Sequence, residues 1–150
     1  MSGMFAVLAL AAGAAIATQA TMNARLGVLL GSSTLGMSFA FLSSSLVCLG
    51  ILAAVPREWP SVEALRAVPR VLWFGGVLSA FGVGMLYYLI PRMGAGPMMS
   101  LALTGQIVVA VVASHFGWFE LPAQPVNAVH ACGLTALIVG VVLLNWEWTV

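Results

Sequence analysis

The sequence contains no lysine and no aspartate, and only 6% of its 150 residues are charged. Without lysine, Schiff-base chemistry is excluded, and without aspartate so is any dyad that needs one. The formal net charge of +1 supplies no positive field for capturing nucleic acid. In soluble domains roughly a quarter of all residues are charged. This composition therefore excludes an ordinary soluble domain.

The motifs of the common enzyme classes are also missing. The sequence has no nucleophile elbow, no paired acids and no phosphate loop followed by lysine. The two cysteines, Cys48 and Cys132, have no second ligand at metal spacing. We predict that the chain is not an enzyme and uses no metal and no cofactor.

Hydrophobic residues make up 62% of the sequence and gather in long apolar runs. A membrane-spanning helix needs about 20 mostly apolar residues. We predict an all-α polytopic membrane protein, a single transmembrane domain over residues 1–150. Its five helices are expected at about 4–22, 35–55, 71–90, 98–118 and 128–144. Tryptophan prefers the ends of such spans, where Trp73, Trp118, Trp146 and Trp148 fall.

Two of the connecting segments have a distinctive composition. Residues 56–70 hold three of the five arginines, and Ser61 to Val68 is predicted to form a short helix in the membrane interface. The segment from Pro91 to Pro97 is rich in helix breakers and is predicted to be a tight turn.

The arginines barely distinguish the two sides of the membrane. Five spans place Arg57, Arg66 and Arg70 on one side, and Arg25 and Arg92 on the other. Because arginine and lysine set orientation, this balance is compatible with insertion both ways and an antiparallel dimer. Alternatively, the amino terminus is cytoplasmic, which places the loop with three arginines inside. The arginine bias for this orientation is clearer if Arg25 belongs to the end of the first helix and is left out of the comparison.

Small residues four positions apart lie on one face of several spans, where they allow helices to approach closely. Such a stripe in the first span is Ala11 and Ala15, followed by Gln19 and Asn23. Further stripes are predicted to pack helices or copies of the chain: Gly76, Ala80 and Gly84 in the third span, and Ala136 and Gly140 in the fifth.

Polar side chains within the spans are the candidates for a substrate site. An unpaired amide in hydrocarbon costs several kcal/mol, so Gln19, Asn23 and Gln106 should face protein or a water-filled cavity. We predict that these amides contact the substrate and that Tyr88 and Trp73 form aromatic walls.

Ionisable groups inside the spans are scarce, and no glutamate lies well within one. His115 and His130, near the ends of the fourth and fifth spans, are candidates for proton coupling because histidine titrates near neutral pH. The alternative is that they anchor helix ends at the interface.

Several motifs resemble the YdcZ-type inner-membrane exporters over nearly the whole chain. The resemblance rests on Gln19-Ala20-Thr21-Met22-Asn23, Trp73-Phe74-Gly75-Gly76, Pro91-Arg92-Met93-Gly94-Ala95 with Gly105-Gln106, His115-Phe116-Gly117, and Gly133 with Gly140-Val141. One position departs from the family pattern: Ser114 stands where an aspartate usually precedes the histidine. A charge-coupling role for that aspartate is therefore not carried over.

The resemblance implies membership of the drug/metabolite transporter superfamily and half of a ten-helix inverted-repeat transporter. It predicts a small-molecule exporter in the bacterial inner (cytoplasmic) membrane that works as an antiparallel homodimer. An odd number of spans fits this, because a second, inverted copy completes the repeat. The substrate, a small organic molecule, would bind at the midplane. Two alternatives are an accessory subunit without transport activity and half of an obligatory heterodimer with a paralogous chain.

Overall fold

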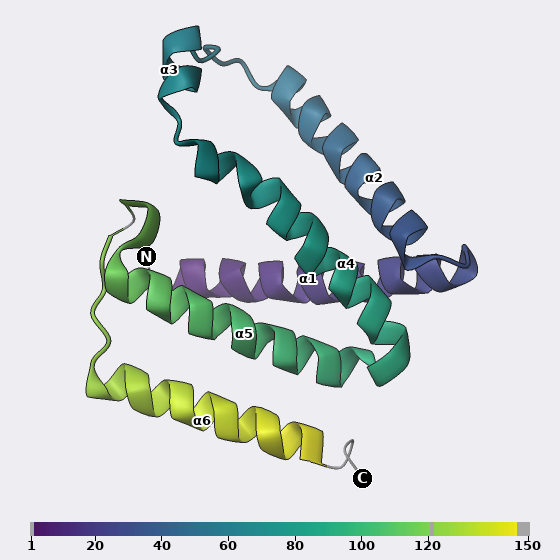
Figure 1. Ribbon diagram of the computed structural model, residues 1–150, viewed down its shortest axis with the longest axis vertical. Helices are drawn as coiled ribbons and strands as arrows, with labels where there is room; N and C mark the ends of the chain where they lie inside the picture. Colours follow the sequence, from purple (N-terminus) through teal and green to yellow (C-terminus); the bar gives the residue numbers. More distant parts are fainter. Residues whose placement is uncertain (1, 121, 147–150) are drawn as a thin grey trace. The chain divides into compact units, whose positions relative to one another are not determined.

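The computed structural model describes residues 2–120 and 122–146, and within these residues the chain is helical without strands (Figure 1). Five helices of the described part are long and apolar enough to cross a membrane, which confirms the predicted number of spans. The helices are α1 (Ser2–Leu29), α2 (Ser33–Ala54), the short α3 (Val62–Ala67), α4 (Gly75–Met93), α5 (Ala95–Phe116) and α6 (Ala128–Asn145).

The first helix is longer than the sequence predicted. α1 continues past Met22 to Leu29, so that Asn23 and Arg25 lie within it. The polar residues at the predicted boundary do not break a helix, whereas Gly31, with φ of 69°, does. Ser32 then caps α2 by accepting a hydrogen bond from the Leu35 N–H at 3.3 Å.

The chain divides into two compact units, Met1–Arg92 and Met93–Val150. The prediction of a single domain over residues 1–150 stays a prediction.

In the first unit, α1 and α2 pack through small residues. Ala20 and Ala24 of α1 are almost fully buried, and Gly36 and Ala40 of α2 are buried as well. A Cβ on Gly36 would lie 2.8 Å from the Gly27 Cα, so the two backbones touch where both residues are glycine. Ala11 and Ala15, the stripe suggested by the sequence, are exposed. Close backbone approach therefore holds this helix pair.

Residues 55–74 connect α2 to α4. The predicted short helix is present as α3, and the Ser61 hydroxyl caps it by accepting from the Ala64 N–H at 3.1 Å. A 3-10 helix, η1 (Arg70–Phe74), then leads into α4, so Trp73 lies in this turn rather than in the α-helix. The location of α3 in the membrane interface stays a prediction.

The turn predicted at Pro91–Pro97 is far shorter than expected. Pro91, Arg92 and Met93 are helical and belong to α4, and Gly94 alone separates α4 from α5. Gly94 has φ of 88°, which a residue with a side chain adopts only at a cost. Pro97 lies in the first turn of α5, where a missing N–H removes no helical hydrogen bond.

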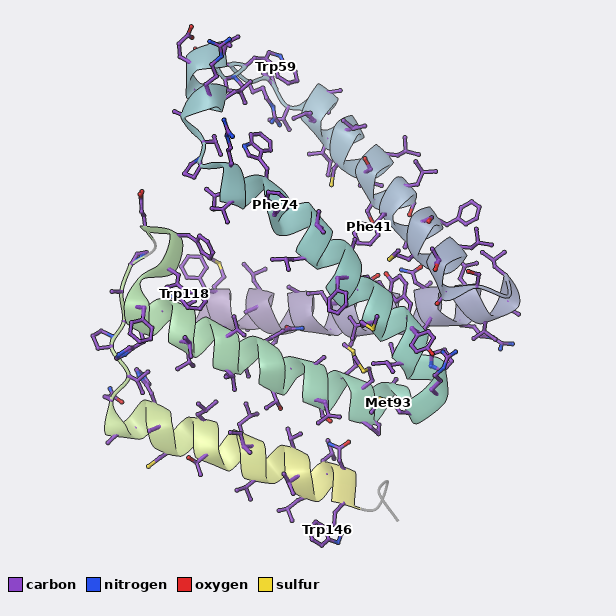
Figure 2. All side chains as sticks on the ribbon, viewed as in Figure 1. Phe41, Trp59, Phe74, Met93, Trp118 and Trp146 are labelled. Atoms are coloured by element: carbon purple, nitrogen blue, oxygen red, sulfur yellow. The ribbon has the colours of Figure 1, made fainter. Side chains whose placement is uncertain are left out.

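In the second unit, α5 and α6 run side by side (Figure 1). A hydrogen bond joins them at one end, and at the other end the segment that connects them is bonded to α5. At one end the Asn145 Nδ2 donates to the Ser100 Oγ at 2.9 Å. At the other, the Gln124 N–H donates to the Ser114 carbonyl at 2.8 Å. Figure 2 shows Trp118 and Trp146 at opposite ends of this pair, as expected for interfacial indoles. Trp148 lies outside the described residues.

Candidate functional site

Three neutral polar side chains of the first unit form a closed hydrogen-bonded cluster. The Asn23 Nδ2 donates to the Gln19 Oε1 at 2.8 Å and to the Tyr87 Oη at 2.9 Å. The Tyr87 hydroxyl in turn donates to the Gln19 Oε1 at 2.9 Å. We call Gln19, Asn23 and Tyr87 the polar triad. It joins α1 to α4.

Helical spacing explains why the triad forms. Gln19 and Asn23 are four residues apart in α1 and therefore share one face. Both side chains are half-buried, whereas Tyr87 is only 2% exposed and lies among the buried positions of α4, with Leu86 and Ile90. A tyrosine buried to this extent needs a partner for its hydroxyl, and the two amides provide it.

The sequence pointed to Tyr88 as the aromatic wall, whereas the cluster contains its neighbour Tyr87. Tyr88 is 42% exposed, and the Arg92 guanidinium carbon lies 3.5 Å from the centroid of its ring. Arg92 also donates to the Tyr88 carbonyl. The spacing of the sequence could have pointed to Tyr87. It follows Gly84 by three residues, and residues three apart share a helix face as residues four apart do.

Two other predicted substrate contacts lie outside the triad. Trp73, in η1, is 63% exposed. Gln106 belongs to α5 in the second unit, is exposed, and has no hydrogen-bond partner among residues 2–120 and 122–146. An amide on an apolar helix with no partner in the described part of the chain favours one from a ligand, from water or from another chain.

The small residues of α4 line a groove against α2 with a volume of about 460 Å³. Ala80, Gly84 and Tyr88 contribute to its wall from α4, and Ser33, Thr34 and Met37 from α2. A Cβ on Gly84 would lie 2.9 Å from the Met37 Sδ, so this glycine packs within the chain. Gly76, by contrast, has open space where its Cβ would be.

A smaller groove of about 360 Å³ lies beside the triad. Its wall includes Tyr87, Arg92 and the glycine and serine residues between α1 and α2. The triad therefore has open volume next to its tyrosine.

The two histidines lie at one end of the α5–α6 pair. The His115 Nδ1 accepts a hydrogen bond from the Val126 N–H at 3.0 Å, and its ring meets Phe116 edge-on with centroids 4.8 Å apart. His130 lines a mainly apolar groove of about 550 Å³ between α5 and α6. Both histidines are exposed, which fits either a proton-accepting or an anchoring role.

Ala136 and Gly140 of α6 are exposed. A Cβ on Gly140 or on Gly133 would meet nothing within 4 Å. This small-residue face of α6 therefore has no close neighbour in the described part of the chain.

The chemistry of the site is neutral hydrogen bonding. The acids that the structure describes, Glu58, Glu63 and Glu120, lie outside the five candidate spans, and Glu147 lies outside the described residues. The triad consists of two amides and a phenol, which can bind polar groups but offer no carboxylate for proton coupling.

Residues 4–143 match the family described as "Putative inner membrane exporter, YdcZ", which confirms the resemblance drawn from the motifs. No curated protein and no solved structure matches the chain.

Proposed function

Because the chain belongs to the YdcZ family of inner membrane exporters, we propose that it exports a small organic molecule as an antiparallel dimer. The observation that carries this proposal is the polar triad, which places hydrogen-bonding groups inside otherwise apolar helices. Such groups are costly in a bilayer and commonly mark a transport pathway. In this proposal the triad and Gln106 bind polar groups of a substrate that lies between the protomers, and Tyr88 and Trp73 are its aromatic contacts.

Three features support the antiparallel dimer. Five spans put the chain's ends on opposite sides, so an inverted copy supplies the second half of an inverted repeat. The exposed face of Ala136 and Gly140 offers the close approach that membrane helices use to associate. Gln106 lacks a partner within the described residues, and a second copy or a substrate would provide one.

The position of Arg25 favours the alternative of a single orientation. Arg25 lies within α1, one turn before Leu29, rather than in the connection after it. Arg92 likewise lies within α4, so if only arginines outside these two helices count, the bias becomes Arg57, Arg66 and Arg70 against none, and the amino terminus is cytoplasmic. A second chain of opposite orientation, a paralogue, would then complete the transporter.

A second candidate function is that of an accessory subunit without transport activity. One observation favours it: both amides of α1 are already hydrogen-bonded to Tyr87 within the chain. An accessory protein would pair its polar groups in this way. The unpaired Gln106 favours the transporter instead.

Orientation is tested by tagging the carboxyl terminus in cells and measuring its accessibility from each side of the membrane. The antiparallel homodimer requires both orientations in comparable amounts. A single orientation would rule out the homodimer and leave the heterodimer or the accessory subunit.

Transport is tested in proteoliposomes loaded with a defined mixture of small neutral and charged metabolites, whose release is followed by mass spectrometry. The wild-type chain should release at least one solute faster than empty liposomes do. Gln106→Leu should reduce that release at least about tenfold, since one buried hydrogen bond to substrate is lost. The matched control is Thr135→Val, because the Thr135 hydroxyl bonds only to the Ala131 carbonyl of its own helix.

Proton coupling through His115 or His130 is part of the proposal. In the same assay, His115→Gln and His130→Gln should each be compared with wild type across pH 5.5–8. A coupling histidine is identified by a variant whose release no longer changes with pH. Unchanged profiles in both variants would assign the two side chains to anchoring.

A further inference from the structure

The hydrogen bonds of the polar triad use up only half of its capacity. The Gln19 Oε1 accepts from two donors, and both N–H groups of the Asn23 amide donate. The Tyr87 hydroxyl donates one bond and accepts one. Each amide therefore has one end committed to the triad and the other end free.

The free ends are of opposite kinds. With Gln19 accepting and Asn23 donating, the Gln19 NH₂ and the Asn23 carbonyl point out of the ring. Turning both amides over reverses the roles and satisfies the three groups equally well. One NH₂ and one carbonyl are left free in either arrangement, so the triad presents the same pair of groups whichever way the two amides are turned.

These ends are accessible and have no other partner. Both side chains are half-buried, and no other hydrogen bond to either exists within the described residues. Among apolar helices, a free amide end costs several kcal/mol unless a ligand, water or protein group pairs with it. A ligand with a complementary pair of groups would remove both costs at once.

We propose that the polar triad binds a neutral amide group, and so selects substrates that carry a primary carboxamide or a lactam, whose carbonyl and N–H lie on the same side. This inference rests on the proposed transport function and names its substrate class. An amide offers one carbonyl to the free NH₂ and one N–H to the free carbonyl of the protein.

Charged groups match the triad poorly. A carboxylate only accepts and would face the free carbonyl, whereas an ammonium only donates and would face the free NH₂. The three side chains carry no charge that could compensate. Arg92 shares the adjacent groove with Tyr87, but the Tyr88 carbonyl and ring already engage its guanidinium.

Tyr87 is a positioning residue in this scheme. Its hydroxyl contacts both amides, and this closes the ring and holds one NH₂ and one carbonyl outward together. Without the hydroxyl, only the Asn23–Gln19 hydrogen bond joins the two amides, so the inner end of each has an unpaired donor or acceptor and the outer ends are less firmly oriented. Tyr87→Phe should therefore weaken selectivity between ligands, while the buried ring keeps its packing in α4.

The test measures equilibrium binding of benzamide to the full chain in lipid nanodiscs. Binding is followed by the ¹⁵N side-chain amide resonances of Gln19 and Asn23. Benzoate, benzylammonium and N,N-dimethylbenzamide are the comparison ligands: each keeps the phenyl ring but loses the donor, the acceptor or the neutral charge. Benzamide should shift both resonances saturably and bind at least about tenfold more tightly than each of the three.

Two variants separate the roles. Tyr87→Phe should reduce the preference for benzamide over N,N-dimethylbenzamide to about twofold or less. Asn145→Leu is the control, because Asn145 is an amide paired to Ser100 in the other unit, and this variant should keep the wild-type preference.

Equal affinity for the four ligands, or no shift of either resonance at the solubility limit of benzamide, would overturn the inference. So would a wild-type preference in Tyr87→Phe, or a hydrogen bond from either amide to a second copy of the chain. Binding selectivity without any solute release would instead refute the transport function alone. Solute release without amide selectivity would refute this inference and leave transport standing.

Discussion

The helix pairs of the two units are held together by different contacts. In the first, α1 and α2 touch backbone to backbone, with Gly36 directly against Gly27. In the second, one hydrogen bond joins α5 to α6, another joins α5 to the segment that connects them, and a groove of about 550 Å³ lies between the two helices. Glycines occur in both pairs, but those of α5 and α6 (Gly96, Gly105, Gly133 and Gly140) have open space where a Cβ would be.

This difference shows that small residues alone do not determine a helix contact. Gly27 and Gly36 draw two helices together because each faces the other. The same residue type on α6 faces nothing in the described chain, and therefore remains available for a partner. The first unit thus uses its facing glycines for contact within the chain, and four substitutions probe that contrast.

The largest effect is expected from Gly36→Val. Its side chain would begin 2.8 Å from the backbone of Gly27, and backbone cannot move aside cheaply. We expect a loss of about 3 kcal/mol in the free energy of unfolding in detergent. The same substitution at Gly133, where the space is open, should change stability by less than about 1 kcal/mol. Equal losses at the two sites would abolish the contrast between the helix pairs.

Tyr87→Phe should come next. It removes both hydrogen bonds that join α4 to α1, at a cost of about 1–2 kcal/mol. Tyr88→Phe is the matched control, because the Tyr88 hydroxyl makes no hydrogen bond within the described residues and Arg92 still stacks on a phenyl ring. Thermal unfolding of both variants measures the difference. A control as unstable as Tyr87→Phe would mean that ring packing, not the triad, joins these helices.

A smaller effect is expected from Asn145→Leu, which removes the tie between α6 and the Ser100 hydroxyl. The loss should be about 1 kcal/mol, and spin labels on α5 and α6 near this end should show a broader distance distribution. Thr135→Val, which breaks only a bond within α6, should leave the distribution unchanged. An unchanged distribution in Asn145→Leu would show that the groove-lining side chains hold the pair.

The smallest effect is expected from His115→Phe. The phenyl ring keeps the edge-on contact with Phe116 but cannot accept the bond from the Val126 N–H. Hydrogen exchange at the Val126 amide should rise about twofold, corresponding to about 0.5 kcal/mol. The Gln124 amide, which is bonded to the Ser114 carbonyl, should exchange as before. Unchanged exchange at Val126 would remove His115 from the connection between α5 and α6.

Much of the fold could be predicted from the sequence, because apolar length reveals a span wherever it occurs. The five spans and the short helix after Ser61 follow from hydropathy, capping and proline positions. Helix ends were harder to predict. α1 runs on to Leu29 and α4 runs through Pro91, since polar residues and a single proline need not end a helix.

The contact faces were harder still to predict. Alanine and glycine are so frequent that small-residue stripes arise on several faces, and only the partner helix decides which one is used. Ala20 and Ala24 are buried in the helix contact because they lie close to Gly27, which faces Gly36. Ala11 and Ala15 are farther from that point and stay exposed. For the triad, the shared face of Gln19 and Asn23 could be predicted, but the choice of Tyr87 over Tyr88 depends on where α4 crosses α1.

The 28 residues of α1 have a consequence for the membrane itself. At 1.5 Å per residue the helix is about 42 Å long, whereas the hydrocarbon layer is about 30 Å thick. The 22 residues of α2 give only about 33 Å. A helix this much longer than the layer has to lean or project into the headgroups. Lipids with longer acyl chains should therefore reduce the tilt of α1 from the bilayer normal. Changing the bilayer thickness would then change the angle between α1, which carries Gln19 and Asn23, and α4, which carries Tyr87.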